Sequence, residues 1–204
     1  MKVTKDKGAW VGPNVIFKGK AHIGFNSCVG YGDEESDLQT TIEDGVEIGA
    51  FCVIAKGATI GRNVEVDHYC RIGNASVVGE NTKILYGSQV FDKVHIGKDC
   101  IIGGHVIDRT VIEDEVTYSG DMAHLHSDPT KNWDTTEEPS PVIRRGSVIG
   151  VGSLIIGGIN IGPRAYIGAG EIAKCDIPEE GVLIGGKLKE LKDFHGMIKV
   201  RGKK

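Results

Sequence analysis

Two histidines stand two residues apart in a stretch that carries several chemically versatile side chains. The segment 122–142 reads MAHLHSDPTKNWDTTEEPSPV and contains His124, His126, Asp128 and Trp133. A neutral imidazole, with a pKa of about 6.5, can accept a proton from an attacking amine or hydroxyl. A His-x-His pair could also hold a metal ion, but no third ligand is evident. Both histidines are therefore candidate general bases, and the bland alternative is a loop histidine that makes an ordinary hydrogen bond.

The elements that must position this segment follow a six-residue repeat. Every sextet opens on a β-branched aliphatic residue: Ile42, Ile48, Ile54, Ile60, Val66, Ile72, Val78, Ile84, Val90, Ile96 and Ile102. The fifth place is small or compact, as in Cys52, Ala58 and Ser76, and Gly, Asn, Asp and Lys fill the places between. A period of six fits neither a helix nor a hairpin sheet. It predicts an all-β solenoid, in which three edges make a coil of about eighteen residues and coils stack about 4.8 Å apart.

Two segments interrupt the repeat, and such breaks are common places for function. The first, YGDEESDLQTT, lies between Val29 and Ile42 and is predicted to be a solvated acidic loop. The second is the segment 122–142, whose tryptophan and prolines favour an ordered loop with a function. Residues 106–118 keep the repeat but slip in phase.

The closing repeats carry a resemblance to a known family. PVIRRGSVIGVGSLIIGGINIGPRAYIGAGEIAKCDIP is similar to the last coils of the hexapeptide-repeat acyltransferases. The resemblance covers nearly the whole chain, and the run from Thr40 to Ile84 is most similar to enzymes that N-acetylate nucleotide-linked amino sugars. It implies a left-handed parallel β-helix of hexapeptide repeats over residues 1–177, with a projecting loop at 122–142 and a short C-terminal helix and basic tail at 178–204.

The resemblance also implies a reaction and an assembly. Enzymes of this family transfer the acyl group of acetyl-CoA, or a related acyl-CoA, to an amine or hydroxyl without a covalent enzyme intermediate. In a homotrimer, the projecting loop reaches into a cleft between subunits. Both loop histidines fall where related enzymes carry the base, so His126 or His124 is the expected catalytic residue. Asp67, His68, Asp128 and Trp133 are the expected contacts to the acceptor.

Coenzyme contacts follow from the same resemblance. The positions that match the family's contacts, mostly through backbone atoms, are Val151, Ala169, Ala173 and Lys174. In the basic tail, Lys189 and Lys192 are expected to face the 3′-phosphate. Leu188, Leu191 and Phe194 have helical spacing, which predicts a short helix that caps the open end of the solenoid. No metal ligand is expected.

The favoured reaction is acetyl transfer to the amino group of a nucleotide-linked amino sugar, and three alternatives stay open. The acceptor could be a small hydroxyl compound. A γ-class carbonic anhydrase shares the β-helix, although His68, His95 and His105 do not reproduce the spacing of its zinc ligands. A structural β-helix without activity would have no reason for the segment 122–142.

Composition narrows the setting. The net charge of −4 argues against a general nucleic-acid partner, and no apolar stretch is long enough to span a membrane. The start MKVTKDKGAWVGP lacks the apolar region of a signal peptide, which favours a cytoplasmic protein. Cys52, Cys70 and Cys100 occupy fifth places of sextets and are expected to be free, buried thiols.

Overall fold

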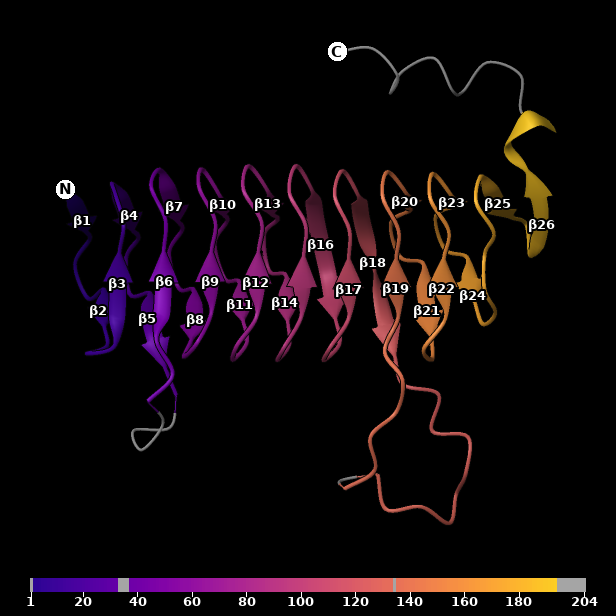
Figure 1. Ribbon diagram of the computed structural model, residues 1–204, viewed down its shortest axis with the longest axis horizontal. Coiled ribbons are helices and arrows are strands. Elements are labelled where there is room, and N and C mark those ends of the chain that lie inside the picture. The colour runs from indigo at the N-terminus through magenta and orange to yellow at the C-terminus, as the bar shows by residue number, and fades with distance from the viewer. Residues whose placement is uncertain (1, 33–36, 134, 194–204) are drawn as a thin grey trace.

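Short parallel strands wind into a three-sided prism (Figure 1). The computed structural model describes residues 2–32, 37–133 and 135–193. Along each coil the chain passes from face A to face B to face C, and the corners are named after the faces that they join. Hydrogen-bonded partners in regular coils lie 18 residues apart, as in Glu65 and Lys83. In Figure 1 the strands of face C point upward at the front as the chain advances to the right, so the solenoid is left-handed, as expected.

Each face is a stack of strands from successive coils. Face A contains β1 (Val3–Lys5), β4 (Ala21–Ile23), β7 (Val46–Ile48), β10 (Glu65–Val66), β13 (Lys83–Ile84), the first part of β16 (Ile101–Val106) and of β18 (Thr117–Ala123), β20 (Val148–Ile149), β23 (Tyr166–Ile167) and β25 (Gly181–Ile184). Face B contains β2 (Trp10–Val11), β5 (Cys28–Tyr31), β8 (Val53–Ala55), β11 (Arg71–Ile72), β14 (Gln89–Val90), the second part of β16 and of β18, β21 (Leu154–Ile156) and β24 (Ile172–Ala173). Face C contains β3 (Val15–Phe17), β6 (Thr40–Ile42), β9 (Thr59–Ile60), β12 (Val77–Val78), β15 (His95–Ile96), β17 (Val111–Ile112), β19 (Val142–Ile143) and β22 (Asn160–Ile161).

The interior confirms the predicted frame. The aliphatic side chains that open the sextets from Ile42 to Ile102 are at most 3% exposed, and the fifth-place side chains are equally buried. A buried hydroxyl is tolerated because the neighbouring coil satisfies it. Ser76 Oγ donates to Phe91 O at 2.8 Å and accepts from Val94 N at 3.1 Å.

The cysteines behave as the repeat predicts. Cys52, Cys70 and Cys100 are buried and unpaired, Cys28 is half-buried, and Cys175 is exposed. Burial raises the pKa of Cys100 to about 11, because the interior disfavours the thiolate. This thiol therefore stays protonated at neutral pH and packs as a small apolar group.

The phase slip has a defined cause at the A–B corner. Regular coils turn this corner in four residues, but β16 passes from face A to face B through only Gly103 and Gly104. A Cβ on Gly104, whose φ is 85°, would lie 1.9 Å from Gly120 O, so only glycine permits the approach of the next coil. The partners in this region are accordingly 16 residues apart, as for Ile101 and Thr117.

The C-terminal segment differs from the expected helix. Lys187–Glu190 form strand β26, antiparallel to β25, and a 3₁₀ helix follows at Leu191–Asp193. The reason is the Gly185-Gly186 turn: both residues have positive φ, as a two-residue hairpin requires, and this turn reverses the chain before a helix can start. Leu188 is about half exposed on β26, and Phe194 lies outside the described residues. Strand β25 pairs with β23 and so continues face A beyond residue 178.

The acidic segment between Val29 and Ile42 is described only in part. Asp33, Glu34 and Glu35 lie outside the described residues, and Asp37 is exposed. Within the described ranges, no helix has the length and apolarity that a bilayer crossing demands.

Candidate functional site

The segment 122–142 leaves the prism at the B–C corner, directly after β18, and forms the projecting loop seen at the bottom of Figure 1. Its fold centres on the carboxylate of Glu138, whose side chain is only 11% exposed. This carboxylate accepts hydrogen bonds from Leu125 N at 2.7 Å and from His126 N at 2.9 Å. The end of the loop thereby fixes the backbone at its beginning, where the two candidate histidines stand.

The structure brings three of the predicted loop residues together. The ring of His126 lies between His124, with ring centroids 5.7 Å apart, and Trp133, at 4.6 Å. His124 is the more buried of the two histidines, with 29% of its side chain exposed, and its Nδ1 lies 3.7 Å from Glu138 Oε2. This buried Nδ1 has no hydrogen-bond partner within the described part of the chain. A small closing movement would let Nδ1–H donate a hydrogen bond to Glu138 and leave Nε2 free to act as a base.

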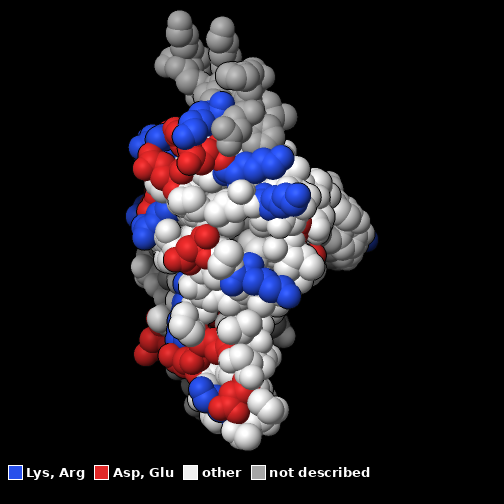
Figure 2. All heavy atoms as spheres, turned by 90° about the vertical axis from the view of Figure 1, so that its right-hand side faces the viewer, with Lys and Arg blue, Asp and Glu red and all other residues white. Residues whose placement is uncertain are grey.

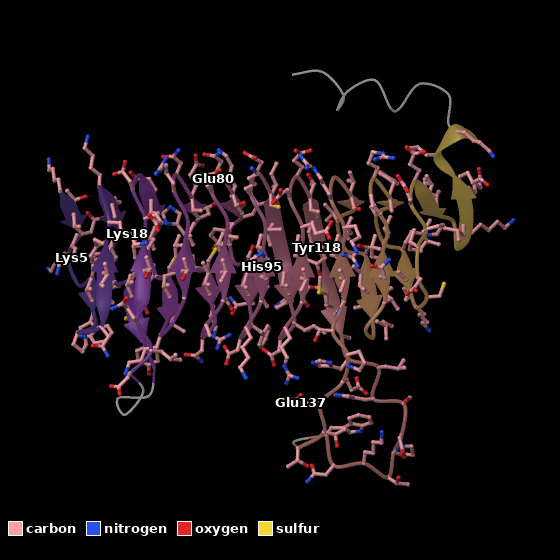
Figure 3. The ribbon with its side chains drawn as sticks, viewed as in Figure 1. Lys5, Lys18, Glu80, His95, Tyr118 and Glu137 are labelled. Carbon is pink, nitrogen blue, oxygen red and sulfur yellow. The ribbon has the colours of Figure 1, made fainter. Side chains whose placement is uncertain are left out.

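These side chains line a cavity of about 300 Å³. Asp108 and Arg109 form its wall on the adjacent coil, and Glu137, labelled on the loop in Figure 3, lies 3.0 Å from Arg109 as an ion pair. Asp128 does not line this cavity. Its carboxylate accepts from the backbone N and hydroxyl of Thr130, at 2.9 and 2.7 Å, and the hydroxyl contact is the main reason that the pKa of Asp128 is lowered.

Another candidate base, which the sequence analysis did not predict, lies at the A–B corner. His105 Nδ1 is 2.6 Å from Asp121 Oδ1, and both side chains are about half exposed. The backbone pairing of β16 with β18 ends at Gly104 and Gly120, so this side-chain contact spans the place where the ladder stops. A carboxylate in this position orients the ring and fixes which nitrogen carries the proton, which is what a general base needs.

The interior anchors this pair. Tyr118 is fully buried among the strands (Figure 3), and its hydroxyl donates to His105 O at 2.8 Å. Burial raises the pKa of Tyr118, so the phenol stays neutral and acts as a donor. The only sequence signal for this site was the phase slip, because the contact depends on a coil two residues shorter than its neighbours.

The other predicted site residues lie on two further parts of the prism. Asp67 and His68 are at the A–B corner of an earlier coil, where the backbone N of His68 donates to Asp67 Oδ1 at 2.7 Å. Val151 is 72% exposed at the same corner near the C-terminal end, and Gly170 N, next to Ala169, donates to Val151 O at 3.0 Å. The structure does not bring Asp67 or His68 into the loop cavity.

The remaining predicted coenzyme positions are at the C-terminal end. Ala173 points into the core, and the whole residue, backbone included, is only 1% exposed, whereas Lys174 is exposed. Lys189 is exposed on β26, and Lys192 pairs with Glu190. Figure 2 shows basic and acidic side chains interspersed over the described part of this end.

Metal binding finds no support in the described residues. Within them, no three His, Cys, Asp or Glu side chains gather in a way that could hold an ion. His68, His95 and His105 lie on separate coils, with His95 on face C (Figure 3) and His105 bonded to Asp121.

Comparisons with known proteins agree with this architecture. A family described as bacterial transferase hexapeptide (six repeats) matches residues 39–74. This part of the chain therefore carries the hexapeptide repeat of that family. The structure of LpxA from Acinetobacter baumannii superposes with a TM-score of 0.59 at 14% identity, over 90% of this chain and 72% of that one, which shows the shared left-handed β-helix fold.

Two relatives show how far the likeness extends. The bifunctional protein GlmU of Acidithiobacillus ferrooxidans is 28% identical over 190 residues, covering 90% of this chain and 38% of that protein. Serine acetyltransferase of Buchnera aphidicola is 38% identical over 83 residues, covering 39% of this chain and 30% of that one. The hexapeptide-repeat chain thus spans well under half the length of these relatives.

Proposed function

We propose that this hexapeptide-repeat protein is an acetyltransferase that moves the acetyl group of acetyl-CoA to the amino group of a nucleotide-linked amino sugar. The observation that carries the proposal is the imidazole of His124, which lies beside a nearly buried carboxylate in the lining of a cavity on the projecting loop. Relatives include a serine acetyltransferase, and the likeness to GlmU runs through almost the whole chain. Transfer to a small hydroxyl acceptor would use the same groups.

The proposed chemistry needs one base and no covalent intermediate. As the acceptor nitrogen attacks the thioester carbonyl, Nε2 of His124 takes its proton, and Glu138 stabilises the imidazolium that forms. The tetrahedral oxyanion then collapses, the C–S bond breaks, and the coenzyme thiolate takes the proton from the imidazolium. His126 and Trp133 form a stacked wall on which an acceptor ring could lie.

The base assignment is tested by four single variants. We expect His124→Ala to lower turnover by about 10²- to 10⁴-fold and to leave the affinity for coenzyme A within a few fold, because a base acts on the barrier. His126→Ala should mainly raise KM for the acceptor. His95→Ala, which removes an exposed imidazole on face C, is the matched control and should change neither the turnover nor the KM for the acceptor. Loss of turnover in His105→Ala with full activity in His124→Ala would instead assign the base to the pair at the A–B corner.

We further propose a homotrimer of about 65 kDa, three times the 21.8 kDa of one chain, with the active site between subunits. The loop leaves at the B–C corner, whereas Val151, Ala169 and the His105–Asp121 pair lie at the A–B corner, across the width of face B. A neighbouring subunit would bring a loop to this corner. Light scattering tests the mass, and an active monomer would contradict the shared site.

Mixed trimers test the sharing itself. Val151→Trp should block the corner at which coenzyme is expected, and His124→Ala removes the proposed base, so each homotrimer should be inactive. Co-expression of the two chains should restore part of the activity, because some clefts then combine an intact corner with an intact loop. Mixed trimers that form but stay inactive would refute a site shared between subunits.

A further inference from the structure

Four aromatic side chains form a ladder along the A–B corner of the N-terminal coils. Phe51 and Tyr69 stack with ring centroids 5.0 Å apart and an interplanar angle of 10°. Phe25 and Tyr86 extend the row at each end through edge contacts of 5.5 Å. All four side chains are large, and they are 40–66% exposed. This aromatic ladder is therefore a continuous apolar strip on the surface, of the kind that marks a binding site.

The ladder is held at a conformational cost. Phe51 and Tyr69 occupy the fourth place of their sextets and have φ of 58° and 61°. The fourth place turns each corner with positive φ. Most other sextets from Ile42 to Asp99 fill it with residues that tolerate this conformation, Gly45, Gly57, Asn63, Asn81, Gly87 and Asp99, and two fill it with Ala75 and Lys93. A bulky aromatic residue is strained there, and strain kept at a surface points to function rather than to folding.

A groove of about 460 Å³ runs beside the ladder on face A. Gly24 and Gly49 line it, and a Cβ on either would meet the backbone of the next coil. Phe25 forms part of its wall. Carboxylates dominate its polar lining: Glu47, Glu65, Asp67 and Asp6. Lys83 also lines the groove, and its ammonium group forms an ion pair with Glu65 at 2.7 Å. The imidazoles of His22 and His68 complete the polar lining.

We propose that the aromatic ladder and this groove bind an oligosaccharide whose sugars carry free amino groups. The faces of exposed rings pack against the C–H faces of sugars, and they attract ammonium groups. The carboxylates can accept hydrogen bonds from hydroxyl and ammonium groups, whereas they repel phosphates, which sets this groove apart from a coenzyme or nucleic-acid site. Four coils at about 4.8 Å each give a strip longer than one sugar ring, so the ligand has several units.

The position of the ladder relates it to the proposed reaction. Tyr86 lies on the coil that precedes the shortened corner. Its neighbour Leu85 reaches that corner, because Leu85 Cδ1 lies 3.4 Å from where a Cβ on Gly103 would be. The strip thus ends beside the His105–Asp121 pair, along the same corner as Val151 and Ala169. The choice of a sugar ligand rests on the proposed function, whereas the existence of the site rests on the ladder and the groove alone.

Calorimetry without coenzyme tests this binding separately from any turnover. The probes are the glucosamine tetramer, the N-acetylglucosamine tetramer and glucosamine, at pH 6, where the amines are protonated. We expect the glucosamine tetramer to bind at least about 10-fold more tightly than either other probe, since it alone combines length with charge. No binding of this tetramer at millimolar concentration would overturn the proposal, whether or not the protein transfers acetyl groups.

The strained positions supply a diagnostic variant. Phe51→Asn combined with Tyr69→Asn places at each corner a residue that tolerates positive φ, so the midpoint of unfolding should stay the same or rise. Binding of the glucosamine tetramer should fall at least about 10-fold. Ala75→Asn, at the fourth place of another corner with φ of 52°, is the matched control and should leave binding unchanged. Tyr86→Ser tests the ladder at a position without positive φ and should also weaken binding.

Other outcomes would refute the proposal in distinguishable ways. Unchanged binding in the double variant would remove the ladder from the site. If light scattering shows a changed protein mass in that variant while the affinity for the glucosamine tetramer stays the same, the ladder is a contact between copies of this chain. A lower midpoint of unfolding with unchanged binding would make it a packing feature only.

Discussion

Replacement of Ile60 by Ala tests the interior of the prism. Ile60 is fully buried on β9 and lies between Ile42 and Val78 of the adjacent coils. Loss of a buried Ile side chain to Ala costs about 2–5 kcal/mol, and the cost is higher where the surroundings cannot collapse into the space. Here ladder hydrogen bonds fix the neighbours on both sides, from Glu43 N to Ile60 O at 2.9 Å and from Gly61 N to Val78 O at 2.8 Å. We therefore expect Ile60→Ala to lower the free energy of unfolding by about 3–5 kcal/mol.

The assay is urea unfolding followed by circular dichroism at a fixed protein concentration. Thr59→Ala is the matched control, because Thr59 precedes Ile60 on the same strand and its side chain alternates to the half-buried outer side. This control should cost less than about 1 kcal/mol. A free energy of unfolding for Ile60→Ala within about 0.5 kcal/mol of the unmodified protein, or a larger loss for Thr59→Ala, would refute the inward assignment of the residue that opens each sextet.

Three further predictions concern other parts of the prism. A maleimide should label Cys175 in the folded protein and the thiols of the core only after unfolding, as mass spectrometry would show; rapid labelling of core thiols would contradict their burial. Gly104→Ala should lower the free energy of unfolding by about 2 kcal/mol or more, since its Cβ would meet Gly120 O, whereas Gly87→Ala, with open space around it, should cost about half as much. The hydrogen bond from Arg144 lowers the pKa of Glu113, so this ion pair stabilises the fold at neutral pH, and the stabilisation is lost as the pH falls below 4.5, the pKa of the unfolded carboxyl. The unfolding midpoint of Arg144→Gln should therefore fall less between pH 7 and pH 3 than that of the unmodified protein. An equal fall in both proteins would contradict this role of the ion pair.

The repeat made the prism predictable, because a six-residue period with small fifth places is satisfied by one kind of interior. Ile60 and Ser76 lie where the frame placed them. The helix predicted at Leu188 is absent because the Gly185-Gly186 turn, a hairpin signal in the sequence, reverses the chain there, and a spacing of three residues alone does not make a helix.

The candidate site was predictable only in its location. The break in the repeat located His124 and His126, yet the stacking on Trp133 depends on how the loop folds around Glu138, which no periodicity describes. The pairing of His105 with Asp121 depends on a coil shortened by two residues, so a frame that assumes equal coils cannot place them together.

Release of coenzyme thiol from acetyl-CoA in the presence of nucleotide-linked amino sugars tests acetyl transfer by the loop most directly. The unmodified protein should release thiol at a rate that depends on the amino sugar. His124→Ala should lose about 10²- to 10⁴-fold in turnover and still bind coenzyme A. No acceptor-dependent release, or near-normal turnover in single variants of both His124 and His126 and in the double variant, would contradict a catalytic role for the loop.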